Sequence, residues 1–592
     1  MKNRRDFLKK MSAGSTAMLI GGAGLGLSAK SYSRVLGTPP ALADEKTISQ
    51  QEMKAKSDAT GKSGIMINWD AGVFWYTLHY DSKLSEGIRS REEALKFTEQ
   101  VINQYEGSQV SDFAMNINSQ VSVYPSKVID SFIDKYNQKI ENGKPVDYTG
   151  TMLAQVNRWY SEYRINIFNI WIKKLKELSI TSWISLRMND VHSITNATSV
   201  YRSDFFFKHA DAGKRVRHRR TTGSGDFMFD YGYEPYRSMM LDYINESLGR
   251  YDADGLELDW TRMDSHLHFQ PGHEDNGVDI LNGFMREVKT IAVERGRERG
   301  REIKISIRVS ESPETMLSVG FDIHTWAKEG LIDIVIPTTR GGTINADIPV
   351  GLWKRLIGEF GILIAPGIDM MAKENPAYRN VTAEAATVAG FASSVFSAGA
   401  DKIYLFNHFA IIPYHNIHFV HDASGKPVYK EAFSNPDDAT RNPAGFSKVI
   451  HTCGEKHSAI NAPRRHLTGF RRNGPFWEKP FIQVPRICAA KRFEYFRILT
   501  GEAPPEAKVT LILGINPEVR LESDDFEVYV NAQPAVFEAV ERIKIWHTEP
   551  KVKESRFYEF KVSSDVLSYT NTIEVSSPSK TFEVTHIEIA VN

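Results

Sequence analysis

From residue 64 to about residue 410, short apolar runs alternate with longer amphipathic segments, a pattern typical of parallel strands joined by helices. Eight runs predict buried strands, at 64–70, 112–118, 181–189, 255–259, 303–310, 332–338, 362–368 and 402–407. Between them, helices are expected at 92–105, 165–178, 236–251, 280–298 and 383–397. Eight such strands close most naturally into a (β/α)₈ barrel. An open doubly wound sheet is the alternative, but no glycine-rich phosphate loop follows the first strand.

The pattern changes near residue 479. Five short alternating runs with turn residues between them, at 509–513, 526–530, 557–562, 572–575 and 585–590, predict an antiparallel β-sandwich. The last barrel helix is expected near 443–456. We therefore assign residues 63–476 to the α/β barrel and residues 477–592 to the sandwich.

The first residues predict export. The run 3–10 (NRRDFLKK) resembles a twin-arginine signal, and a Gly/Ala-rich stretch and the small-residue site Ala41-Leu42-Ala43 follow it. Residues 1–43 are thus a predicted signal peptide and residues 44–62 a polar linker. A membrane anchor is the alternative, but Gly and Ser interrupt the apolar run. The mature protein is expected to be periplasmic or secreted, without a membrane partner.

The charge argues against a nucleic-acid-binding protein, and the cysteine content argues against a cysteine-based metal site. The formal net charge is zero, so the basic footprint of a nucleic-acid binder is absent. The only cysteines, Cys453 and Cys488, could form a disulfide or remain buried thiols, and their spacing gives no metal site. No cofactor is expected.

The fourth predicted strand carries two acids on one face. Leu256-Glu257-Leu258-Asp259 alternates strictly, so Glu257 and Asp259 point to the opposite side from the leucines. Carboxylates are rarely buried on a strand unless something pairs with them. In a barrel, this position is where active sites form, at the carboxyl ends of the strands.

Polar residues collect at the ends of the other predicted strands as well. All loops are polar, but Arg187, Arg308 and Glu257 stand inside alternating runs, which favours a functional reading. The predicted substrate-binding residues are Asp70, Asn118, Arg187, Asn189, Asp190, His192, Trp260, Arg262, Arg308, Arg340 and Asn407.

These segments resemble a known family. The motifs 185–192 (SLRMNDVH), 251–262 (YDADGLELDWTR), 307–309, 320–322 and 330–333 resemble the glycosyl-hydrolase-like-10, or "family 10-like", group of secreted bacterial proteins over residues 64–410. The resemblance implies a barrel of hydrolase type, often with a C-terminal β-sandwich, and leaves the substrate undefined. Family 18 chitinases have a similar strand, but Thr261 stands where they have the catalytic Glu. The α-amylase clan places its two acids where Asp259 and Glu311 lie, but has Arg at position 257.

Hydrolysis of a glycosidic bond needs a proton donor and a second carboxylate that attacks or activates water. We expect Asp259 to be the nucleophile or base and Glu311 to be the proton donor. Glu257 lies deeper and is expected to pair with Arg187 or Arg308, which would keep it ionised and orient Asp259. Asp190 and Asp369 are reserve candidates.

Basic residues gather at the same end of the predicted barrel, namely Arg187, His192, Arg262, His266, His268, Arg308 and Arg340. Arg binds carboxylate and sulfate groups well, so an anionic glycan is one hypothesis. The other is that these arginines neutralise the acids of the site itself. The basic run 214–220 is interpreted as a solvated loop tip or, alternatively, an extension of the cleft.

The leading prediction is an exported glycoside hydrolase with a poly- or oligosaccharide substrate. A metal-dependent hydrolase is the second hypothesis, because His266 and His268, with His192 and Asp190, could hold zinc. The third is a glycan-binding protein without catalytic activity.

Overall fold

The structure is a computed structural model of the chain. It describes residues 63–80, 87–141, 144–145, 148–192, 196, 199–209, 228–261, 268–270, 272–339, 344–372, 374–375, 381–406, 408, 437–439, 442–470, 481–540 and 555–592. The predicted signal peptide and linker lie outside these residues. Residues 64–592 form one compact unit. Within the described part of the chain, no helix has the length and apolar character needed to cross a bilayer.

Parallel strands form a closed barrel, as predicted. In the ring, β13 lies beside β1, and β2, β5, β6, β7 and β8 follow in order. Gly367 of β10 pairs with Thr338 of β8, and β10 also pairs with β13, which closes the ring. The barrel strands are β1 (Ile65–Asp70), β2 (Val110–Asn116), β5 (Thr181–Arg187), β6 (Gly255–Asp259), β7 (Lys304–Ser310), β8 (Ile334–Thr338), β9 (Leu363–Ile364), β10 (Gly367–Asp369) and β13 (Ile403–Phe406).

One predicted strand is divided. The run 362–368 forms β9 and β10, with Ala365 and Pro366 between them. Proline has no backbone N–H to donate to a neighbouring strand, so the ladder is interrupted here. The two pieces together occupy the seventh position in the ring.

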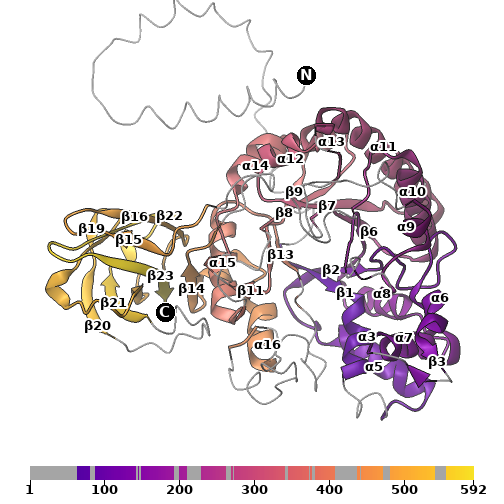
Figure 1. Cartoon of the computed structure of the whole chain (residues 1–592), viewed down its shortest axis with the longest axis horizontal. Coiled ribbons are helices and arrows are strands. Elements are labelled where there is room, and N and C mark those ends of the chain that lie inside the picture. Colours follow the sequence, from indigo (N-terminus) through magenta and orange to yellow (C-terminus); the bar gives the residue numbers. More distant parts are fainter. Residues whose placement is uncertain are drawn as a thin grey trace, which may run out of the picture. The chain divides into compact units, whose positions relative to one another are not determined.

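Helices lie around the outside of the strands (Figure 1). Ser90 and Glu93 form a capping box at the start of α5, in which each side chain accepts a hydrogen bond from the other residue's backbone N–H. The helices are α3 (Ala71–Tyr80), α5 (Arg91–Asn103), α6 (Phe132–Tyr136), α7 (Tyr148–Asn157), α8 (Ile167–Glu177), α9 (Asp204–His209), α10 (Glu234–Arg250), α11 (Glu274–Arg299), α12 (Pro313–Ser318), α13 (Ile323–Lys328), α14 (Val350–Ile357), α15 (Ala385–Ser397), α16 (Pro443–Thr452) and α17 (Lys456–Asn461).

The amino-terminal end of the barrel is filled by side chains. Asp112 accepts hydrogen bonds from Lys402 Nζ at 2.7 Å and from Trp183 Nε1 at 3.0 Å. Gly255 lies under the Trp183 ring, and a Cβ atom at this position would be 2.2 Å from the ring. The Asp-Gly step before β6 is thus required by close packing, and the functional groups gather at the other end.

The C-terminal region is a β-sandwich, also as predicted. One sheet has the order β14-β23-β17-β21-β20, with β15 on β23, and the other has the order β16-β22-β18-β19. The strands are β14 (Arg464–Leu467), β15 (Arg486–Cys488), β16 (Glu494–Leu499), β17 (Val509–Ile515), β18 (Glu527–Val530), β19 (Gln533–Pro534), β20 (Val536–Val540), β21 (Arg556–Val562), β22 (Thr570–Ser576) and β23 (Phe582–Val591). Strand β14 pairs with β23 although it lies in the range predicted for the barrel.

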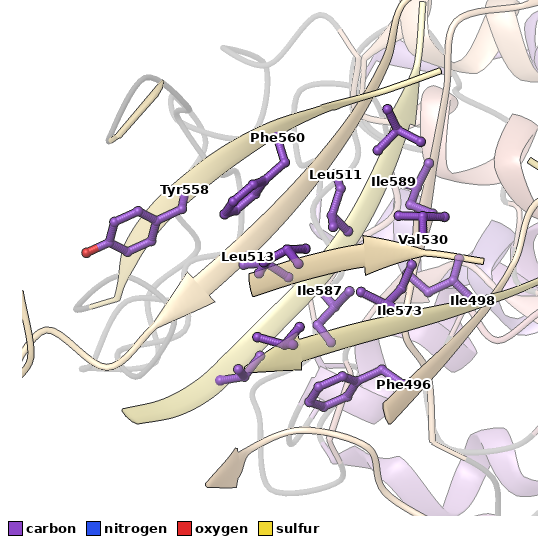
Figure 2. Close-up of a cluster of buried hydrophobic side chains, with 14 of the residues drawn as sticks. Phe496, Ile498, Leu511, Leu513, Val530, Tyr558, Phe560, Ile573, Ile587 and Ile589 are labelled. Carbon is purple, nitrogen blue, oxygen red and sulfur yellow. The ribbon is translucent and has the colours of Figure 1, made fainter. Parts of the chain in front are cut away.

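Apolar side chains from both sheets interlock in the sandwich core (Figure 2). From β17, Leu511 and Leu513 are fully buried, and Ile573 of β22 and Ile587 of β23 pack with them in the same cluster. Cys488 belongs to this core, and Cys453 is buried in the barrel. Both are free thiols, and burial raises the pKa of each to about 12.

A buried charge network joins the sandwich to the loop after the seventh barrel position. His586 contacts Glu374 at 2.5 Å and Glu588 at 3.2 Å. Arg465 bridges Glu588 and Glu384, with a distance of 2.8 Å to the latter. Burial alone would lower the pKa of His586, but the two carboxylates outweigh it and raise that pKa to about 9. The network therefore holds residues before α15 against the sandwich.

Candidate active site

Strand register places the predicted acids and arginines in two adjacent rows inside the barrel. Arg187, Asp259 and Arg308 are paired across β5, β6 and β7 in one row. Ser185, Glu257 and Ser306 form the row beneath it, one step closer to the amino-terminal end. All six side chains are buried, so the two acids occupy a shared polar interior.

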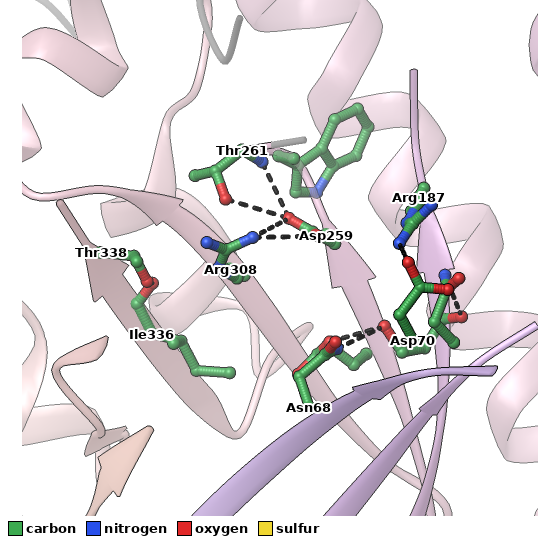
Figure 3. Close-up of polar contacts among 12 residues, drawn as sticks. Asn68, Asp70, Arg187, Asp259, Thr261, Arg308, Ile336 and Thr338 are labelled. Atoms are coloured by element: carbon green, nitrogen blue, oxygen red, sulfur yellow. Dashed lines mark hydrogen bonds and ion pairs between the residues drawn. The ribbon is translucent and has the colours of Figure 1, made fainter. Parts of the chain in front are cut away.

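Asp259 is held by four donated hydrogen bonds. Arg308 Nη1 lies 3.1 Å from each carboxylate oxygen, and the backbone N and Oγ1 of Thr261 lie 3.1 and 3.0 Å from Oδ1 (Figure 3). A cation and two further donors all favour the charged form of a carboxylate. Asp259 is only 1% exposed, and its orientation is fixed without any contact from a ligand.

The Arg308 guanidinium is itself constrained on its other side. Its carbon lies 3.8 Å from the centroid of the Phe406 ring, which is the geometry of a cation–π contact. Phe406 is the last residue of β13. Arg308 thus connects Asp259 to a strand on the far side of the ring.

Glu257 has a different environment. Its Oε1 accepts hydrogen bonds from Ser185 Oγ at 2.6 Å, Asn68 Nδ2 at 2.7 Å and Tyr404 OH at 3.1 Å. Its Oε2 has no hydrogen-bond partner among the described residues. Burial, reinforced by the charge of Asp259, raises the pKa of Glu257 to about 7.

The expected ion pair of Glu257 with Arg187 or Arg308 is wrong. Arg308 pairs with Asp259, and Arg187 pairs with Asp70 at 2.5 Å and Asp190 at 3.2 Å. The physical reason is that other carboxylates already occupy both guanidinium groups, while the groups that reach Glu257 Oε1 are those of Ser185, Asn68 and Tyr404. Glu257 is consequently surrounded by uncharged donors, and its proton is retained to higher pH.

A second polar cluster surrounds Arg187. Asp190 accepts from Arg187 and lies 2.8 Å from His192 Nδ1 through the same Oδ2 atom. Asp70, at the end of β1, completes the cluster on the other side of the guanidinium (Figure 3). Asp70, Arg187, Asp190 and His192 are thus brought together as one unit beside Asp259.

Two predicted binding amides contact backbone groups. Asn118 accepts from Arg187 N at 2.9 Å and donates to Arg187 O at 3.1 Å. Asn189 donates to Phe229 O at 2.8 Å and accepts from Phe229 N at 3.0 Å. These contacts brace the segment that carries Arg187 and Asp190, so the two residues position the cluster.

Trp260 lies on the opposite side of β6 from the two acids. Its indole packs edge-on against the rings of His268, Phe284 and Phe321, and it is fully buried. This placement gives the residue a packing role outside the barrel ring.

Glu311 follows β7, the strand next to β6. Ser310 Oγ donates to Glu311 Oε2 at 3.2 Å, and Trp353 Nε1 donates to the backbone carbonyl of Glu311 at 2.9 Å. Its side chain is 1% exposed. Glu311 thus lies at the carboxyl end of the strand adjacent to that of Asp259, where a proton donor was predicted. Asp369, a reserve candidate, ends β10.

Four predicted residues lie outside the described residues: Arg262, His266, Arg340 and Asn407. The basic run 214–220 lies outside them too.

The metal hypothesis also involves His268. Its Nε2 lies 3.1 Å from the carbonyl of Trp260, and burial lowers its pKa to about 4. No group of three or more His, Cys, Asp or Glu side chains among the described residues is arranged to hold a metal ion. His268 packs against Tyr231, Trp260 and Phe321 and is a core residue.

Several residues of this site were not predicted, among them Asn68, Ser185, Tyr404 and Phe406. A signal for them was present, because Asn68 alternates with Asp70, Ser185 with Arg187, and Tyr404 with Phe406 in their strands. Treating each buried run as alternating between two faces would have found them.

No known protein family matches the sequence, and no curated protein matches it. Similar solved structures include the glycoside hydrolase domain of PgaB (BpsB) from Bordetella bronchiseptica, with 9% identity, 58% of this chain and 93% of that chain covered, and a TM-score of 0.36. The α-fucosidase of Thermotoga maritima in complex with fucose has 9% identity, 90% and 100% coverage and a TM-score of 0.31. A cycloisomaltooligosaccharide glucanotransferase of Paenibacillus has 7% identity, 83% coverage of this chain and a TM-score of 0.30.

This chain spans only about half, 55%, of the glucanotransferase. At these identities and scores, the likeness carries no argument about a reaction. We therefore infer the chemistry from the barrel residues themselves.

Proposed function

We propose that this protein is an exported glycoside hydrolase that cleaves a poly- or oligosaccharide with two carboxylates, as a member of the "family 10-like" group. One observation carries the proposal: Asp259, at the carboxyl end of β6, accepts hydrogen bonds from Arg308 and Thr261, one row above Glu257, whose pKa is raised to about 7. Neighbouring acids whose environments differ in this way are typical of acid–base sites.

In this proposal, Asp259 attacks the sugar or activates water, because its contacts with Arg308 and Thr261 stabilise negative charge. Glu311, on the neighbouring strand end, protonates the leaving oxygen. Glu257, neutral over part of the physiological range, supports Asp259 from below without adding a second full charge beside it.

The ion pairs of the described arginines help to decide whether the substrate is anionic. Arg187 is occupied by Asp70 and Asp190, and Arg308 by Asp259. This pairing favours the hypothesis that the arginines neutralise the site's own acids. The anionic-glycan hypothesis now depends on Arg262 and Arg340, and activity on acidic glycans that is unchanged in Arg262→Ala and Arg340→Ala would remove it.

The test is a product screen on neutral and acidic polysaccharides with the wild-type chain, Asp259→Asn and Glu311→Gln. Each substitution should lower kcat by at least about a hundredfold while the fold, followed by circular dichroism, is kept. Glu314→Gln is the matched control, since Glu314 is an exposed carboxylate three residues after Glu311. Full activity in Asp259→Asn would contradict the proposal.

A glycan-binding protein without turnover is the second candidate. The pairing of Asp259 with Arg308 would also serve to keep a charged residue buried without catalysis. Sugar binding with no product from any polysaccharide in the screen would favour this candidate.

A further inference from the structure

The sandwich presents an aromatic row on its outer surface. In the sheet β16-β22-β18-β19, Tyr495, Glu574 and Tyr529 are in register across three neighbouring strands. Residues on either side of them along the chain, such as Phe496 and Val528, belong to the core. Because side chains alternate along a strand, the three residues of the row face away from the core.

Two rings of this surface are unusually exposed for their size. Tyr495 is 57% exposed and Phe493, two residues earlier on the same face, is 38% exposed. The ring centroids of Phe493 and Tyr529 are 5.9 Å apart. Tyr495 and Tyr529 are separated by two strand spacings, or about 10 Å. The surface is therefore a platform on which Phe493 and Tyr529 pack together and Glu574 lies between Tyr529 and Tyr495.

An ion pair links the strand that carries Tyr495 to a loop at the carboxyl end of the barrel. Arg497, two residues after Tyr495 on β16, forms an ion pair with Asp347. Asp347 lies in the loop between β8 and α14, which leaves the barrel at the same strand ends that carry Asp259 and Glu311. A chain lying on the platform would thus approach the rim of the proposed active site.

A small hollow of about 20 Å³, roughly the space for one water molecule, lies at the junction. Its lining includes Asp347 and Asn345 from the barrel loop, and Gln483, Arg497 and the half-exposed Phe481 from the sandwich. Gln483 is fixed by two hydrogen bonds to the backbone of Arg497. Another aromatic ring and several polar groups therefore lie between the platform and the barrel.

The chemistry of these groups identifies the occupant. Flat apolar rings pack against the C–H faces of sugar rings, and carboxylates and amides accept or donate hydrogen bonds to hydroxyl groups. Glu574 and Glu527 stand on this face, and Arg497, on the same strand as Tyr495, is paired with Asp347. Such a surface disfavours an anionic chain.

We propose that Phe493, Tyr495 and Tyr529 form a second glycan-binding site that holds an uncharged segment of the polysaccharide beside the barrel. The identity of the occupant rests on the proposed function. In this proposal, the rings bind one segment of the substrate on the sandwich while another segment lies in the barrel.

The experiment is affinity gel electrophoresis of the full chain carrying Glu311→Gln in gels containing a neutral β-glucan, a xylan, a soluble chitin derivative or an acidic alginate. We expect retardation by at least one neutral polymer, and about tenfold weaker binding for each ring removed in Tyr495→Ala and Tyr529→Ala. Tyr495→Phe, which keeps the ring, should bind as the parent does. Val536→Ala, on the exposed edge of the other sheet, is the control.

Retardation by none of the neutral polymers, or equal retardation of the parent and the Tyr495→Ala, Tyr529→Ala double variant, would overturn the proposal, as would retardation by alginate alone. Circular dichroism of each variant separates lost binding from lost folding. The binding assay needs no turnover. Binding here, together with no product from the wild-type chain in the polysaccharide screen, would leave this site intact and reject the hydrolase. Product from the wild-type chain without binding at the platform would reject this site and leave the hydrolase intact.

Discussion

Strands β6 and β17 are both central, buried and surrounded by other strands, yet they present opposite chemistry to their interiors. In the barrel, β6 directs Glu257 and Asp259 inward. In the sandwich, β17 directs Val509, Leu511 and neighbouring aliphatic residues inward. A buried charge is tolerated only where other groups compensate it. The barrel thus contains a set of mutually dependent polar contacts that the sandwich core does not need.

The largest expected difference is in the barrel. Arg308→Met removes the cation that faces Asp259 and should lower the apparent free energy of unfolding by about 3–5 kcal/mol, because the carboxylate remains buried without a countercharge. Urea denaturation followed by fluorescence measures it. The control, Arg286→Met, breaks an exposed pair with Glu329 and should cost less than about 1 kcal/mol. Equal losses in the two variants would show that the barrel interior is more hydrated than we infer.

In the sandwich, stability should depend on how well the apolar core is filled, whereas in the barrel it depends on charge pairing. Leu511→Ala leaves a cavity in the core and should cost about 2–5 kcal/mol in the same denaturation experiment. Val536→Ala, at an exposed position on β20, should change stability by less than about 0.5 kcal/mol. A small loss for Leu511→Ala would mean that the core collapses readily around the cavity.

The contribution of Glu257 to the stability of the barrel should depend on pH, which is not expected of the apolar sandwich core. Its pKa is raised from 4.5 to about 7 in the folded protein. The folded state therefore binds this proton more tightly than the unfolded state does, and the resulting stability is complete below pH 4.5 and is lost as the pH rises through about 7. The stability difference between wild type and Glu257→Gln should change by on the order of 3 kcal/mol across this window, in favour of the variant at high pH.

Unfolding midpoints of both proteins from acid to mild alkali measure this change. Glu314→Gln is the control at an exposed site. A difference between wild type and Glu257→Gln that is independent of pH would contradict the inferred environment of Glu257.

The smallest effects concern two glycines. Gly255→Ala places a methyl group against Trp183 and should cost about 1–3 kcal/mol. Gly283, inside α11, has nothing within 4 Å of its would-be Cβ, so Gly283→Ala should stabilise the protein by up to about 1 kcal/mol. Thermal unfolding distinguishes the two signs. Stabilisation by Gly255→Ala would show that the floor of the barrel can rearrange.

The barrel could be predicted from the sequence because its strands are short, apolar and separated by amphipathic helices. Strands β5 and β6 begin where they were predicted to begin. Strand β14 was missed because its sequence, Arg464-Arg465-His466-Leu467, is basic and alternates only weakly. It becomes a strand because β23 supplies hydrogen bonds and Glu588 supplies charge to Arg465. Such tertiary contacts leave no local signal.

The site was predicted only in part, because the partners of its acids also depend on contacts between distant segments. Alternation identified Glu257 and Asp259 as inward-facing, but the partner of each acid depends on the stagger between strands. The register that matches Asp259 with Arg308, and Glu257 with Ser306, is a property of the closed ring. The sequence alone therefore assigned Glu257 a cation, where the ring supplies hydroxyl and amide groups.

The charged contacts at the junction have a practical consequence for anyone who would recombine these modules. Glu374 and Glu384 belong to the barrel segment, while the groups that neutralise them, His586 and Arg465, belong to the sandwich. A chimera that exchanges the chain after residue 476 would leave Arg465 and β14 with the barrel and would remove His586 and Glu588, the partners of Glu374 and Arg465. The exchangeable unit is consequently the sandwich together with residues 370–384.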